Sequence, residues 1–182
     1  MNELSRASWT WRPGRYASNE PMILKSQVEW VLHCCAVLSG LPEGRYLSTK
    51  DLAEFHGLPK EYLSKALQSL SQARLIESTL GPSGGYRLTK AAGQITLLDI
   101  VEAIEGKRST FNCTEIRKNN PCRLAQDCES KPCGIARIMW EADEAWRNTL
   151  RNVSLSELAR QHSAETSPEP YQRSAEWISA RI

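Results

Sequence analysis

The sequence lacks any apolar stretch long enough to cross a lipid bilayer, so we expect no transmembrane helix and no membrane partner. Its first 21 residues contain tryptophan, arginine and proline but no apolar segment of the secretory type, and we therefore expect a cytoplasmic protein. A strong charge of either sign is also absent, because the net charge of the 182 residues is only +2. That balance excludes a polycation that binds nucleic acid along its whole length.

The common signatures of enzymes are missing as well. The sequence has no phosphate-binding loop, no dinucleotide-binding glycine motif and no nucleophile with a matched base. It contains only three histidines. We therefore expect no enzymatic activity.

Cysteine, in contrast, is plentiful. Six cysteines in a chain without an export signal indicate reduced thiols, and hence metal binding or redox chemistry. Four of them, Cys113, Cys122, Cys128 and Cys133, lie in a polar loop at residues 107–133, with eight, five and four residues between them. Four thiolates on a loop can hold an iron–sulfur cluster or zinc. No CxxC pair is present, and structural zinc sites usually use such pairs, so the pattern favours a cluster.

Residues 22–106 have the pattern of a winged helix-turn-helix domain. Apolar residues recur with helical spacing from 23 to 38, a capping motif at Ser48 begins a second helix, and Pro59 suits the start of a third. Two strand-like runs then flank a glycine-rich turn, which predicts a β-hairpin. The predicted fold class is mainly α, with a small β-hairpin wing and a long dimerisation helix.

The third predicted helix is the candidate recognition helix, because an α-helix fits the major groove of DNA. Its leucines are spaced to face inward, which leaves a polar face outside. On that face Ser64 and Gln68 are expected to reach base edges, while Lys60 and Lys65 contact phosphates. The remaining candidate DNA contacts are Ser48, Lys50, Tyr62, Ser83, Gly84 and Arg87.

The segments outside the helix-turn-helix and the wing are predicted to be helices or flexible ends. A helix is expected from Ile95 to Ile104 with Thr96 as its N-cap. Residues 134–160 are expected to hold an amphipathic dimerisation helix and a short following helix. Residues 1–21 are predicted to be a disordered extension, and the proline-containing residues 161–182 a mobile tail. The dimerisation helix would pair with its copy in a homodimer through Ile135, Ile138, Met139 and Trp146.

Four motifs carry a resemblance to a known family. They are Leu52-Ala53-Glu54, Pro59-Lys60-Glu61-Tyr62-Leu63, Gly84-Gly85-Tyr86-Arg87-Leu88 and the run from Ile95 to Gly106. On these residues the chain resembles the IscR/NsrR/RsrR family of bacterial winged-helix transcription regulators, up to about Gln161 when the cysteine loop is included. The resemblance implies a homodimeric repressor that binds an inverted repeat in double-stranded DNA. It further implies that an iron–sulfur cluster senses redox state, nitric oxide or iron supply.

The resemblance also implies a mixed set of cluster ligands. In some family members an acidic ligand lies near the start of the first helix, where this chain has Glu29, and His33 follows one helical turn later. A [2Fe-2S] site would use Cys113, Cys133, Glu29 and His33, whereas a [4Fe-4S] site would use three loop cysteines with Glu29. In the family, three consecutive cysteines often have five residues in each gap. Cys122, Cys128 and Cys133 have five and then four residues between them, and this departure favours the [2Fe-2S] site.

The sequence also leaves an alternative function open and departs from the family pattern at one position. A cofactor-free or zinc-binding regulator of the same fold, which senses through thiols, is the alternative function. Family wings often place a basic residue just before the first glycine of the turn, where this chain has Leu80. A different target sequence is therefore expected.

Overall fold

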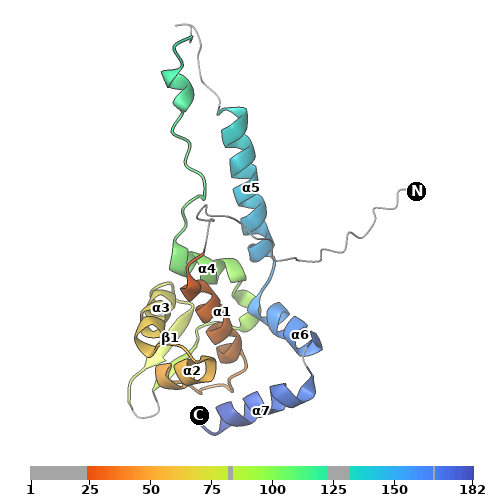
Figure 1. Ribbon diagram of the computed structural model, residues 1–182. Helices are drawn as coiled ribbons and strands as arrows, with labels where there is room; N and C mark the ends of the chain where they lie inside the picture. The colour runs from red at the N-terminus through yellow and green to blue at the C-terminus, as the bar shows by residue number, and fades with distance from the viewer. Residues whose placement is uncertain (1–23, 82–83, 123–131, 166) are drawn as a thin grey trace, which may run out of the picture.

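The computed structural model describes residues 24–81, 84–122, 132–165 and 167–182, and Figure 1 shows a mainly helical chain with one antiparallel hairpin. The predicted fold class is thereby confirmed. The extension predicted at residues 1–21 lies outside the described residues. Among the helices that the structure describes, none combines the length and the apolar character needed to span a membrane.

Helix α1 (Ser26–Ser39) lies at the centre of the domain and packs against α3 (Lys60–Gln72) and α4 (Leu97–Glu105). Cys34 and Cys35 are fully buried on α1. Burial raises the pKa of the Cys34 thiol to about 12, and burial followed by the nearby Cys34 raises that of Cys35. Both thiols stay protonated at neutral pH and serve as core residues.

Local signals in the sequence set the helix-turn-helix. Ser48 begins α2 (Thr49–His56) by accepting a hydrogen bond from the Asp51 N–H at 3.1 Å. Gly57 ends α2 in the left-handed region at φ 64°, which favours glycine. Helix α3 begins directly after Pro59 and buries the predicted leucines at 63, 67 and 70.

The wing consists of β1 (Ile76–Thr79) and β2 (Gly85–Leu88), paired antiparallel. Strand β2 also pairs with the residue before the N-cap of α2, because the Tyr86 N–H donates to the Leu47 carbonyl at 2.9 Å. A Cβ on Gly85 would lie 2.4 Å from that carbonyl oxygen, so only glycine fits. Gly85 therefore has an intramolecular role, which is to let β2 lie close to the backbone at Leu47.

Helix α4 begins with a capping box formed by Thr96 and Asp99, which confirms the predicted N-cap. A short 3₁₀ turn η1 (Ala92–Gln94) precedes it, and a second one, η2 (Ile116–Asn119), lies in the cysteine loop. Helix α5 (Gly134–Arg151) is followed by α6 (Leu155–Glu165). In Figure 1, α5 and the described part of the cysteine loop extend together away from the winged-helix domain. We call these two segments the sensor arm.

Helix α7 (Pro168–Ser179) occupies the segment for which the prolines had predicted a mobile tail. Proline is well tolerated in the first turn of a helix, where no intrahelical N–H bond is lost. The helix lies against α2, with the Trp177 and Phe55 ring centroids 5.1 Å apart. Arg181 stacks over Trp177 at 3.5 Å and pairs with Glu54 at 3.1 Å.

This contact can be tested by substitution. Trp177→Ala should lower the free energy of unfolding by about 1–3 kcal/mol, because it removes the ring that packs on Phe55 and Arg181. Tyr171→Ala is the matched control, since Tyr171 lies on the same helix and is 58% exposed. We expect it to change stability by less than about 0.5 kcal/mol in urea unfolding. Equal effects of the two substitutions would contradict the docking of α7 on α2.

Candidate functional site

The outer face of α3 presents a polar surface. Lys60, Lys65 and Gln68 are exposed, Tyr62 is 59% exposed, and Ser64 is half-buried. These are the side chains that the sequence assigned to base edges and phosphates, and the structure brings them together on one helix. Cationic and amide groups in this arrangement can bind DNA in the major groove.

The remaining candidate DNA contacts surround that helix. The Ser48 hydroxyl is engaged with Asp51 at the start of α2, while Lys50 is exposed in the first turn. Arg87 donates from Nε to Glu77 Oε1 at 2.5 Å and lies 5.0 Å from the Tyr46 ring centroid, so it is held within the wing. Gly84 belongs to the tight hairpin turn, and Ser83 lies outside the described residues.

The described loop cysteines have different surroundings. Cys113 is half-buried, Cys122 is exposed, and Cys128 lies outside the described residues. Cys133 is the N-cap of α5, where its Sγ accepts a hydrogen bond from the Ala136 N–H at 3.3 Å. A helix N-terminus stabilises a thiolate, which is the form that binds metals.

Glu29 and His33 are exposed on α1. The His33 ring lies near α2, with its centroid 5.8 Å from that of His56. The pKa of His56 is lowered, first by burial and then by the nearby His33, and its buried Nε2 has no hydrogen-bond partner among the described residues. Over the described ranges, the structure groups no three His, Cys, Asp or Glu side chains in a way that could hold a metal ion. One chain therefore does not assemble the predicted ligand set from these residues.

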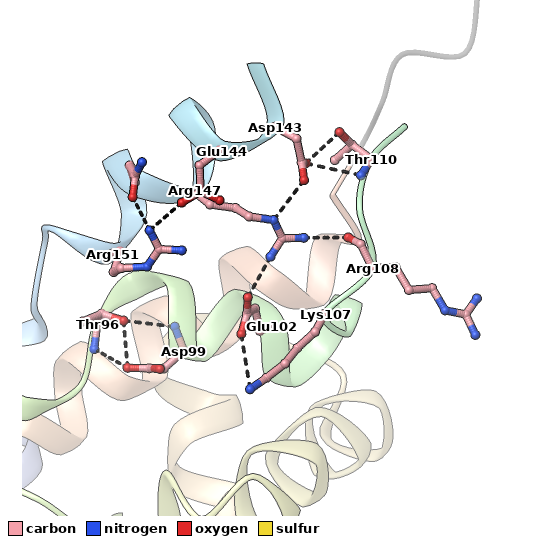
Figure 2. A network of polar contacts seen from close by, with 11 residues as sticks. Thr96, Asp99, Glu102, Lys107, Arg108, Thr110, Asp143, Glu144, Arg147 and Arg151 are labelled. Carbon is pink, nitrogen blue, oxygen red and sulfur yellow. Dashed lines mark hydrogen bonds and ion pairs between the residues drawn. The ribbon is translucent and has the colours of Figure 1, made fainter. Parts of the chain in front are cut away.

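A network of charged groups joins the sensor arm to the winged-helix domain (Figure 2). Its centre is Arg147 of α5, which reaches Glu102 of α4 at 2.7 Å and Asp143 of its own helix at 3.1 Å. The same guanidinium donates to the carbonyl oxygen of Arg108 at 2.6 Å, where the cysteine loop begins. The side chains of Arg147, Glu102 and Asp143 are only 11%, 17% and 9% exposed. Limited contact with water strengthens these interactions.

Thr110 completes the network from the loop side. Its hydroxyl and its N–H both donate to Asp143 Oδ1, at 2.7 and 3.2 Å. Burial acts to raise the pKa of Asp143, but hydrogen bonds from Thr110 and Arg147 outweigh it, and the pKa is lowered. Sequence reasoning missed this junction, because its contacts join residues 33 to 45 positions apart. The available signal was Asp143 and Arg147, which lie four residues apart on α5 and can pair on one face of that helix.

Comparison with known proteins shows which family the chain belongs to. A family model described as Rrf2, iron-dependent transcriptional regulator, matches residues 24–161. The chain belongs to the Rrf2 family. It is therefore a winged-helix transcriptional regulator, and the expectation that it is not an enzyme is confirmed. Helix α7 lies beyond the residues that match.

Individual relatives agree with this assignment. Protein rrf2 of Nitratidesulfovibrio vulgaris is 35% identical over 118 residues, which are 64% of this chain and 73% of that protein. YwgB of Bacillus subtilis, named among the HTH-type transcriptional regulators, is 31% identical over 134 residues, covering 74% of this chain and 82% of its own. The fold is shared with CymR, the global cysteine regulator of B. subtilis, at a TM-score of 0.61 and 21% identity, over 77% of this chain and 98% of CymR. It is also shared with T. potens IscR, at a TM-score of 0.60 and 19% identity, over 81% and 93% of the two chains.

The polar junction yields a prediction for α5. Arg147→Ala should lower the free energy of unfolding by about 2–4 kcal/mol, because two poorly exposed carboxylates lose their cation. Arg151→Ala is the control one turn further along, where Arg151 and Glu144 form a pair with 45% and 55% exposed side chains. We expect the control to cost about 0.5 kcal/mol or less. Urea unfolding curves of the two variants that coincide would show that the junction does not hold the arm.

Proposed function

We propose that this Rrf2-family regulator is a homodimeric repressor that binds an inverted repeat and senses its signal through an iron–sulfur cluster on the sensor arm. The dimer is supported by the apolar side chains that α5 leaves in water. Ile135 is 71% exposed, Ile138 62% and Met139 40%, whereas Trp146 is half-buried beside Arg147. An apolar stripe of this kind is typical of a protein–protein interface. Pairing of two α5 helices would hold two recognition helices about one DNA turn apart.

The donor chemistry of the arm fits a cluster. The Cys133 sulfur lies at the first turn of α5, where it accepts a hydrogen bond from the Ala136 N–H, and the half-buried Cys113 and the exposed Cys122 lie on the same loop. Glu29 and His33 offer a carboxylate and an imidazole on the surface of α1. Figure 1 places the start of α5 at the end of the arm remote from α1, so we propose that a second chain supplies one part of the set. A bound cluster would supply redox and ligand-exchange chemistry at these residues.

The protein's own residues would transmit the change. Arg147 and Asp143 hold both the start of the cysteine loop and α5, and Glu102 joins them to α4. Helix α4 packs against α1 and against the recognition helix α3. A rearrangement of the loop would thus act on α3 through one polar junction, and DNA affinity would change by the difference in stability of the two arrangements.

A thiol-based regulator without a cluster is the second candidate. A structural neighbour, S. aureus CymR, was solved in a form described as oxidized, at a TM-score of 0.56 and 26% identity. Cysteines 113 and 122 are accessible enough for oxidation.

DNA recognition can be tested with two substitutions on α3. Lys65→Ala should weaken binding to every sequence and lower the slope of affinity against salt by about one, because one phosphate contact is lost. Gln68→Ala should cost about 1–3 kcal/mol on the preferred site alone, because a base contact is lost. Lys118→Ala, in the cysteine loop, is the control and should retain wild-type binding. A chain that stays monomeric and binds no genomic fragment at low salt would refute the proposed dimeric regulator.

The cluster can be tested by anaerobic reconstitution followed by absorption spectroscopy. Cys113→Ala and Cys133→Ala should abolish the chromophore, and His33→Ala should shift its spectrum because one ligand is exchanged. Cys122→Ala separates the two cluster types, since it preserves a [2Fe-2S] site and destroys a [4Fe-4S] site that uses Cys122. Cys34→Ala is the control and should leave the spectrum unchanged, because Cys34 lies in the core.

Two results would count against parts of this proposal. A colourless wild-type protein after reconstitution would favour the thiol-based regulator. Unchanged spectra for both Glu29→Ala and His33→Ala would exclude mixed ligation and require an all-cysteine set.

A further inference from the structure

The tip of the wing carries an aliphatic side chain with almost no protein contact. Leu80 directly follows β1 and is 98% exposed, against 74% for Ile116, the next most exposed large hydrophobic residue that the structure describes. A single exposed leucine is common on protein surfaces, so its location decides what it means. This one lies at the end of the hairpin that accompanies the recognition helix.

The turn is built tightly around that position. Thr79 pairs with Gly85 at the end of the ladder, and the Gly84 N–H donates to the Gly81 carbonyl at 2.9 Å. A Cβ on Gly84 would lie 2.5 Å from the Thr79 carbonyl oxygen, so no side chain fits there. Gly81 has a φ of 111°, which side-chain-bearing residues rarely adopt. Gly81 and Gly84 therefore lie close together, and among the described residues of this turn Leu80 carries the exposed large apolar side chain.

Charge is absent from the same tip. The sequence from Ile76 to Tyr86 contains no lysine or arginine, and its single charged residue is Glu77. Glu77 lies opposite Arg87 in the ladder and pairs with it, which holds that cation towards the base of the hairpin. The segment thus has no cationic side chain to neutralise a phosphate, and Leu80 adds an exposed aliphatic group beside its hydroxyl-bearing residues.

We infer that Leu80 enters the minor groove beside the major-groove site of α3 and packs against sugars and base edges there. This inference rests on the proposed DNA binding. Only residues 73–75 separate α3 from β1, and the two elements are in contact, so the wing stays beside α3 when that helix enters the major groove. The minor groove is about 6 Å wide, and leucine is among the side chains that wedge between base steps and bend DNA. Such a wedge favours flexible pyrimidine–purine steps.

The test uses the full chain and a duplex selected from genomic fragments by the wild-type protein. Leu80→Ala should weaken binding to that duplex by about 5- to 20-fold and reduce the bend angle, because the wedge is lost. The slope of affinity against salt should stay unchanged, since no phosphate contact is removed. Leu80→Arg should increase that slope by about one and shift preference towards A·T-rich sites, whose narrow minor groove attracts arginine.

Tyr171→Ala, which removes an exposed aromatic ring from α7, is the control and should retain wild-type affinity and bending. Leu80→Ala with wild-type affinity and bend angle would overturn the inference and leave the proposed function standing. A wild-type protein that selects no fragment would overturn both. Fluorescence anisotropy gives the affinities, and energy transfer between labels at the duplex ends gives the bend.

Discussion

The apolar face of α1 is the contact on which the rest of the fold depends. Helix α1 packs against α3, α4, α6 and β2, so one helix orients the recognition helix and the wing, and it is joined to the sensor arm through α4. Among the described residues, every fully buried side chain of this core is hydrophobic. Hydrophobic burial has little directional preference, so it stabilises the assembly without fixing angles. The angles come from backbone pairing and helix caps, such as the pairing of Leu47 with Tyr86.

The sensor arm is attached by a different kind of interaction. Arg147 joins three partners through hydrogen bonds and ion pairs, and each bond requires a particular position of its partner. Poorly exposed ion pairs of this kind contribute less to net stability than to the choice of one geometry. The molecule therefore has an apolar domain that tolerates small adjustments and a polar attachment that selects one orientation.

Most elements could be predicted from the sequence, because their signals are local. The capping motifs at Ser48 and Thr96 and the turn at Gly57 each act within a few residues, and the helices begin where these signals place them. The docked helix α7 could not be predicted, because its contact between Trp177 and Phe55 joins distant segments. The candidate DNA surface followed from helical periodicity alone. The arrangement of the cysteines did not, since sequence spacing carries no information on how a loop closes.

Helix α5 is long, and Arg147 anchors it near its C-terminal end, so a displacement at its first residue would rotate the helix about Arg147 like a lever. That residue lies 13 positions from the first residue of α5, which corresponds to a lever of about 20 Å. A displacement of about 1 Å at the far end rotates the helix by only roughly 3°, and this moves a point about 13 Å from Arg147, the radius of gyration of a 100-residue domain, by about 0.7 Å. By this geometry alone, a displacement at the start of α5 reaches the winged-helix domain reduced by about one third, so a movement of about 3 Å there corresponds to about 2 Å at that distance.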